Sequence, residues 1–144
     1  MSYEIPGVVA SFLSGTTSLA QYKVVRLSAA NTVVHTTGPA SSTARLFVLG
    51  VLQSVPAAST VSTGHVCVVM LTGISKVMAS SRAIAAGANL RHTSGAMGTS
   101  GGTVMTSSAS TKHNIVGIAL TSAAASVGAS SIAAKARYIS MKLR

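Results

Sequence analysis

Short runs of Val, Ile, Leu and Thr recur along the chain, and Gly, Ser, Asn and Pro separate them. Runs of about four to eight such residues between turn-forming residues are typical of β-strands. The longest strongly apolar runs, Leu46–Leu52 and Val66–Leu71, are far shorter than the ~18 residues that a membrane-spanning helix needs. The pattern therefore predicts an all-β protein with short strands at Val8–Leu13, Tyr22–Leu27, Thr32–Thr36, Leu46–Gln53, His65–Thr72, Ile74–Met78, Asn89–His92, Thr103–Thr106, Ile115–Thr121 and Arg137–Leu143.

The last of these runs alternates between apolar and polar residues. Because successive side chains of a strand point to opposite faces, one face of this strand is predicted to be apolar and the other polar. The apolar face holds Ile139, Met141 and Leu143, and the polar face holds Tyr138, Ser140, Lys142 and Arg144.

The segments between the strands have the composition of turns and loops. Ser28–Asn31 is predicted to form a hairpin turn in which Asn31 adopts a positive φ. Two Ala-rich segments, Ser81–Ala88 and Ser122–Ala129, could each form one helical turn closed by Gly, but they are too short to stand as independent helices. We interpret them as connections. Thr93–Thr111 has too few apolar residues to be buried and is predicted to be a long surface hairpin or mobile loop.

The chain also resembles itself. Leu46–Ser54 matches Asn114–Ser122, which aligns Gly50 with Gly117 at an offset of 67 residues. Further matches follow in the same order on either side: Lys23–Leu27 with Asn89–His92, Thr32–Thr36 with Thr103–Thr106, and His65–Leu71 with Arg137–Leu143. An ordered series of this kind predicts two halves with equivalent strands.

Together these patterns predict a single β-rich domain over residues 1–144, built as a short-stranded β-sandwich or barrel with long Ser/Thr/Gly loops. The two pseudo-repeated halves would span about 8–72 and 74–144, after an extended N-terminal tail at 1–7. The start of the chain has neither a basic segment nor a continuous apolar segment, so we expect no secretory signal.

The charge balance is very unequal. Glu4 is the single carboxylate side chain, Asp is absent, and eleven Lys and Arg residues give a formal net charge of +10. A compact body with this much like charge attracts an anionic surface, so the counter-charge is expected to come from a partner. The cations are dispersed apart from a C-terminal group: Lys23, Arg26, Arg45, Lys76, Arg82, Arg91, Lys112, Lys135, Arg137, Lys142 and Arg144.

The residue types that most sites require are scarce. Glu4 alone cannot make a general acid–base pair, and the chain has no Asp or second Glu to orient a catalytic His. His65 and Cys67 could lie on one face of a strand and recruit a third His to a zinc site, but no paired-Cys motif accompanies them. In its apolar run Cys67 is better interpreted as a small buried hydrophobe. We therefore expect no catalytic residues, no cofactor, no metal and no enzymatic activity.

Two kinds of anionic partner fit the charge. Nucleic acid would supply dense phosphate charge, and a basic nucleic-acid-associated protein is the alternative hypothesis. Proteins that bind single strands, however, place aromatic residues among the cations, and this chain has two Phe, three Tyr and no Trp. An acidic protein surface fits the dispersed cations better.

A family resemblance points the same way. The segments that carry it are Val24–Val34, Phe47–Leu52, Val66–Val77, Ala83–Ala88, Asn114–Leu120 and Tyr138–Leu143. In this order they resemble the small capsid cement (decoration) proteins of tailed bacteriophages. Members of that family often carry an acidic residue where this chain has Ala88.

The resemblance implies a virion protein on the outer capsid surface that bridges neighbouring major capsid protein subunits and resists internal DNA pressure. It also implies a homo-oligomer, a trimer or a dimer, without membrane contact. We expect capsid contact from the flexible N-terminal segment around Glu4 and from the C-terminal cations Lys135, Arg137, Lys142 and Arg144. The alternative for these cations is the exposed face of an edge strand, where Lys discourages aggregation.

Overall fold

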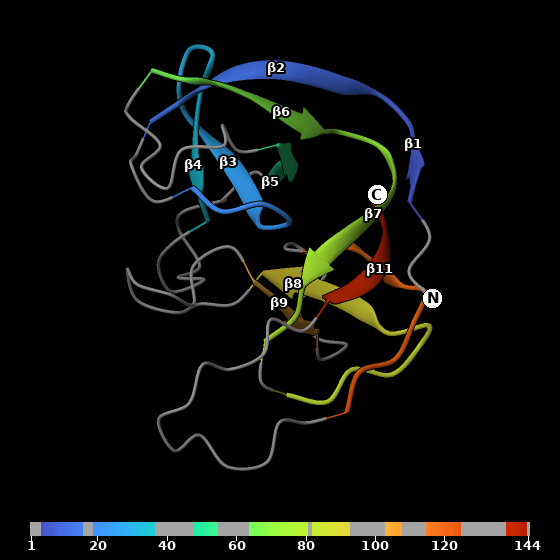
Figure 1. Ribbon diagram of the computed structural model, residues 1–144. Coiled ribbons are helices and arrows are strands. Elements are labelled where there is room, and N and C mark those ends of the chain that lie inside the picture. Colours follow the sequence, from blue (N-terminus) through green and yellow to red (C-terminus); the bar gives the residue numbers. More distant parts are fainter. Residues whose placement is uncertain are drawn as a thin grey trace.

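The computed structural model describes residues 4–15, 19–36, 48–54, 64–80, 82–92, 103–107, 115–124 and 138–143. Within these residues the chain is all β, without a helix, and its strands form two sheets (Figure 1). The predicted fold class, a small β-barrel or sandwich with two related halves, is confirmed.

Every predicted strand is present, with ends shifted by at most two residues. The strands are β1 (Ile5–Pro6), β2 (Val9–Ser14), β3 (Val24–Ala29), β4 (Thr32–His35), β5 (Val48–Ser54), β6 (Val66–Met70), β7 (Gly73–Met78), β8 (Asn89–His92), β9 (Val104–Thr106), β10 (Ile115–Ala119) and β11 (Tyr138–Leu143). The sequence pattern did not predict β1, because two residues are too few to show an alternation.

The first half of the chain, β2 to β6, forms a closed barrel in the order β2-β4-β3-β5-β6. Its neighbours pair antiparallel except β2 and β4, which pair in parallel at Leu13↔Thr32 and Ser14↔Val33 and close the barrel. The second half, β7 to β11, forms a sheet in the order β1-β7-β11-β10-β8-β9, with β1 added at its edge.

Both halves use one strand order. Reading from the first strand of each, β2-β6-β5-β3-β4 corresponds to β7-β11-β10-β8-β9. The same irregularity also recurs. Leu49 is the extra residue of a bulge in β5 opposite β3, and Val116 is the extra residue of a bulge in β10 opposite β8. Each bulge directly precedes the glycine that the sequence alignment matched, Gly50 or Gly117.

The parallel contact that closes the barrel has a counterpart in the second half. Gly15 N–H donates to Val33 O at 2.8 Å, and Ser80 N–H donates to Val104 O at 2.8 Å. An isolated parallel bridge between Ala79 and Val104 lies beside the second bond. The second half therefore repeats the strand order of the barrel, but its sheet is open, and within the described residues β9 meets the end of β7 only at this bridge.

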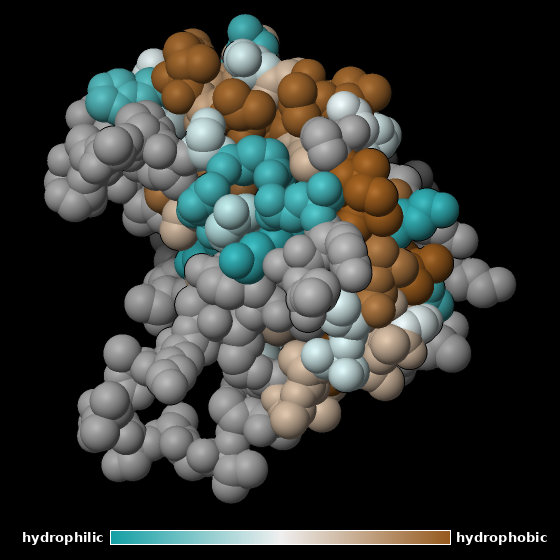
Figure 2. All heavy atoms as spheres, turned by 45° about the vertical axis from the view of Figure 1, so that its right-hand side comes forward, coloured by the Kyte–Doolittle hydropathy of each residue, from teal (hydrophilic) through white to brown (hydrophobic). Residues whose placement is uncertain are grey.

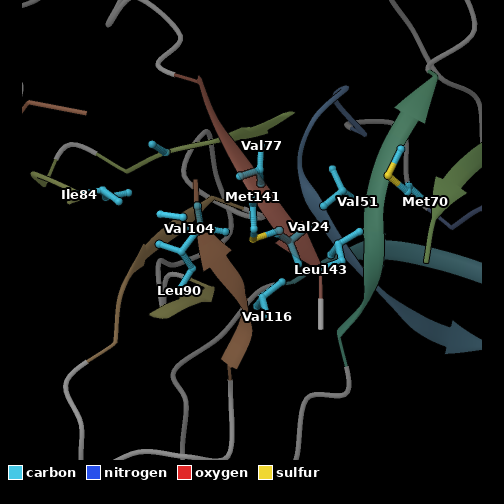
Figure 3. Packing of buried hydrophobic residues seen from close by; sticks show 12 residues of the cluster. Val24, Val51, Met70, Val77, Ile84, Leu90, Val104, Val116, Met141 and Leu143 are labelled. Carbon is cyan, nitrogen blue, oxygen red and sulfur yellow. The ribbon is translucent and has the colours of Figure 1, made fainter. Parts of the chain in front are cut away.

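Two hydrophobic clusters form the core. The interior of the barrel holds Leu19, Val25, Val33, Leu52, Cys67 and Val69. A larger cluster combines the interior of the second half, including Leu90, Val104 and Met141, with three residues of the first half, Val24, Val51 and Met70 (Figure 3). The first half thus packs its outside against the inside of the second half.

The connections differ in part from their predicted roles. Asn31 has the predicted positive φ, 63°. Residues 82–88 and 122–124 of the two Ala-rich segments form no helix, and Ile84 and Ala123 instead pair with each other as an antiparallel bridge. Within the predicted loop Thr93–Thr111, Thr103 and Val104 are buried, because β9 places Val104 inside the second half. The rest of that loop, apart from residues 105–107, lies outside the described residues.

Two further expectations need correction. Ser140, assigned to the polar face of the last strand, is buried, although Lys142 on the same face is exposed. The residues that follow β10 contact Ser140 here: its backbone N–H donates to Thr121 Oγ1 at 3.0 Å, and its backbone oxygen accepts the Leu120 N–H at 2.8 Å. Ile5 and Pro6 of the predicted flexible tail are paired with Ile74 and Gly73 of β7. The N-terminal segment is therefore extended there but attached to the edge of the sheet.

Candidate partner-binding surface

The residues predicted to contact a partner can be followed only in part. Glu4 is exposed and directly precedes β1, and Lys142 is exposed on β11. Lys135, Arg137 and Arg144 lie outside the described residues. Since β1 and β11 both pair with β7, Glu4 lies next to the edge strand of the sheet that contains Lys142.

Lys142 lies in a row of side chains that crosses the second sheet. Residues directly opposite one another on neighbouring strands point to the same face. The register gives one continuous row over β1, β7, β11, β10 and β8, which we name the Lys142 row: Ile5, Ile74, Lys142, Ile118 and Asn89. Ile5, Lys142 and Asn89 are exposed, and Ile74 and Ile118 are half-buried. The row is therefore a partly apolar surface with one central ammonium group.

A second apolar surface lies on the barrel. Val9 and Leu13 of β2 and Val66 of β6 are large apolar residues that remain exposed, and Leu13 and Val66 are register partners. Figure 2 shows apolar side chains over the top of the molecule, where β2 and β6 lie, and down its right-hand side.

The other described cations do not gather at either surface. Lys76 lies over the ring of Tyr22, with Nζ 5.0 Å from the ring centroid, a cation–π contact at the junction of the two halves. Arg26 and Arg91 are half-buried at equivalent positions beside the two bulges. Arg82 is exposed in the connection after β7.

Lys23 departs most from a surface role. Its exposed fraction is 6%, and that of the neighbouring His35 is also 6%. Ala20 N–H donates to His35 Nε2 at 3.0 Å, which requires that Nε2 carry no proton. Burial, together with the positive charge of Lys23, lowers the pKa of His35 to about 4. Burial also lowers the pKa of Lys23. These two basic groups belong to the interior and not to a binding surface.

The zinc hypothesis finds no support among the described residues. His65 is exposed, whereas Cys67 points into the barrel and its Sγ donates to Phe12 O at 3.4 Å. Burial raises the pKa of the Cys67 thiol, which disfavours the thiolate that a metal would need. No three of the described His, Cys, Asp and Glu residues come together as a metal site.

The sequence reasoning selected Lys142 but missed the isoleucines around it. Ile5, Ile74 and Ile118 belong to three strands far apart in sequence, and their proximity follows from sheet order, which no local pattern encodes. One signal was present: the repeat alignment matches Lys142 with Met70, an apolar residue. A charged residue at an equivalent position indicates that the two halves present this position to different surroundings.

Comparisons with known proteins do not identify the chain. No protein-family model matches it, and no curated protein matches it. Among the described residues no helix is both long and apolar enough to cross a membrane.

Proposed function

We propose that this protein binds the outer surface of a phage capsid, as a dimer or trimer, and cements neighbouring major capsid protein subunits against internal DNA pressure. It acts as a surface and carries out no chemistry. The resemblance to capsid cement proteins of tailed bacteriophages supports this proposal, as does the all-β fold of short strands.

The observation that carries the proposal is the lack of counter-charge combined with exposed apolar side chains. One carboxylate side chain cannot neutralise eleven cations, so most of the charge is left for a partner. Ile5, Val9, Leu13 and Val66 are exposed on the same molecule. Apolar contacts supply affinity in a protein interface, and complementary charge supplies steering and register.

The direct test adds the purified protein to capsids that lack it and measures co-sedimentation. Binding is expected to weaken between about 0.1 M and 1 M salt, over which the Debye length falls from ~10 Å to ~3 Å. Bound protein should also raise the temperature at which filled capsids release DNA. A mixture of the same protein with duplex DNA is the control.

The outcomes separate the two hypotheses for the charge. Saturable binding to capsids, with weak binding to DNA, supports the cement role. Absence of capsid binding at every salt concentration overturns it. Tight and steeply salt-dependent binding to duplex DNA, without affinity for capsids, favours the nucleic-acid-associated protein instead.

A further inference from the structure

The contact between the two halves uses one row of the barrel. Val24, Val51 and Met70 are register partners on β3, β5 and β6, and Val9 of β2 continues the row. We name these four residues the Met70 row. Val24, Val51 and Met70 are buried in the cluster that fills the second half (Figure 3). Val9, in contrast, is exposed. The Met70 row is therefore a docking surface that the chain already uses internally.

The common strand order identifies the equivalent row in the second half. Gly50 is equivalent to Gly117, and the residues that follow these glycines, Val51 and Ile118, are therefore equivalent. Through the register, the remaining members of the Met70 row correspond to members of the Lys142 row: Val24 to Asn89, Met70 to Lys142, and Val9 to Ile74. The described part of the chain contains nothing that buries this second row as the first is buried, since Lys142 and Asn89 are exposed.

The composition of the Lys142 row indicates what it would bind. Ile74 and Ile118 flank Lys142 on the neighbouring strands, and Ile5 lengthens the apolar surface by one strand. When a partner covers such a surface, water is excluded around the ammonium group and its attraction to a carboxylate becomes stronger. The matching surface therefore presents a carboxylate surrounded by apolar side chains.

A second copy of this chain does not fit that description. It has one carboxylate side chain, Glu4, and so offers little to pair with Lys142; the proposed dimer or trimer would associate through another surface. The interior that accepts the Met70 row inside the chain is apolar, and Lys142 in place of Met70 would lose its hydration there. The occupant is thus a different protein with an acidic surface.

We propose that the Lys142 row is the face with which the protein docks on the capsid, with Lys142 paired to a carboxylate of the major capsid protein and Ile5, Ile74 and Ile118 packed around the pair. This inference rests on the proposed function and specifies its contact surface. The apolar surface of β2 and β6 is left for other contacts.

The test compares variants in the dissociation constant for capsids that lack the protein. Lys142→Glu reverses the charge, and Ile5→Ser removes an exposed apolar side chain. Arg82→Glu and Leu27→Ser are the matched controls, because they make the same kinds of change at exposed positions outside the row and outside the apolar surface of β2 and β6. Loss of a desolvated charge pair weakens binding by about 30-fold or more, and we expect this for Lys142→Glu. Ile5→Ser should weaken binding by about tenfold. The controls should stay within about threefold of the original protein.

A carbodiimide cross-linking experiment provides a readout that does not depend on variants. The reagent joins an amine to a carboxylate that contacts it, and mass spectrometry of the bound complex should find Lys142 joined to an Asp or Glu of the major capsid protein. Sedimentation of the protein alone tests the alternative occupant, a second copy.

The results distinguish the two proposals. If the original protein binds and the row variants bind as tightly as their controls, the row is not the docking face, although the cement function stands. A Lys142 cross-link to another copy, or an oligomer lost in Lys142→Glu alone, overturns the choice of occupant. If the original protein does not bind capsids at all, the proposed function itself fails.

Discussion

At the scale of single residues, two buried basic side chains make the stability of this chain depend on pH. Lys23 and His35 are buried side by side in a protein with almost no acidic groups. His35 is tolerated because it is neutral and accepts the Ala20 N–H. A proton on Nε2 would remove that hydrogen bond and place a second positive charge beside Lys23. The neutral imidazole is therefore part of the folded state.

We predict that acid destabilises the protein through His35. Burial and the charge of Lys23 lower its pKa in the folded state to about 4 from the ordinary 6.5. Between these two pH values the unfolded chain binds a proton that the folded chain does not, so the free energy of unfolding falls as pH falls. The loss should total about 3 kcal/mol, be absent above pH 6.5, and level off below pH 4.

Urea unfolding between pH 7 and pH 4 measures this effect. His35→Gln should remove most of the pH dependence, because Gln can accept the Ala20 N–H but does not titrate. His65→Gln, at an exposed position, should keep it. If the free energy of unfolding falls with pH as steeply in His35→Gln as in the original protein, His35 is not the source of the pH dependence.

At the scale of elements, the two bulged strands show how closely the halves are built alike. A β-carbon on Gly50 would overlap the backbone oxygen of Met70, and one on Gly117 would overlap that of Lys142. Each glycine thus permits its strand, β5 or β10, to approach the next strand, β6 or β11, after the bulge. The glycine repeat in the sequence marks this contact.

We predict that Gly117→Ala and Gly50→Ala each destabilise the fold by about 1–3 kcal/mol, because a backbone atom and not a flexible side chain stands in the way. The midpoint of urea unfolding at neutral pH measures the change. Ser11→Ala, at an exposed strand position, is the control and should stay within about 0.5 kcal/mol. If Gly117→Ala is as stable as this control, the close approach is not a constraint.

The elements could be predicted well from the sequence and their arrangement could not. Val, Ile and Thr between turn residues gave the position of every strand but β1, and the burial of Cys67 followed from its apolar run. Ser140 was assigned to the wrong surroundings, because alternation gives the faces of a strand but not which neighbours cover them. For the same reason the charge of Lys142 was enough to predict a partner contact from the sequence. The isoleucines beside it could be found only from the order of strands in the sheet.

At the scale of the whole molecule, the shared cluster makes the two halves one unit. Val24, Val51 and Met70 of the first half belong to the same cluster as Leu90 and Met141 of the second. Gln53 Nε2 of β5 also donates to Ser75 Oγ of β7 at 2.8 Å, and Met78 N–H donates to Tyr22 O at 2.8 Å. Neither half can lose its packing without exposing apolar surface of the other.

We therefore predict that the chain unfolds in one cooperative transition. Leu52→Ala in the barrel interior and Leu90→Ala in the second half remove fully buried side chains, and each should lower the free energy of unfolding by about 2–5 kcal/mol. Both variants should shift the same midpoint, whether circular dichroism or Tyr fluorescence is followed. Two separate transitions, each moved by one variant alone, would show that the halves fold independently.

The internal interface joins unlike surfaces, the outside of one half and the inside of the next. Contacts between unlike surfaces can repeat in an open series when every unit carries both surfaces. In this chain the first half cannot accept a further unit in this way, because it is a closed barrel whose interior is already packed. The outward row of the second half also differs from that of the first, since it carries Lys142 and Asn89 where the first carries Met70 and Val24. The closed barrel of the first half and Lys142 of the second therefore both disfavour an open series of copies built through this interface.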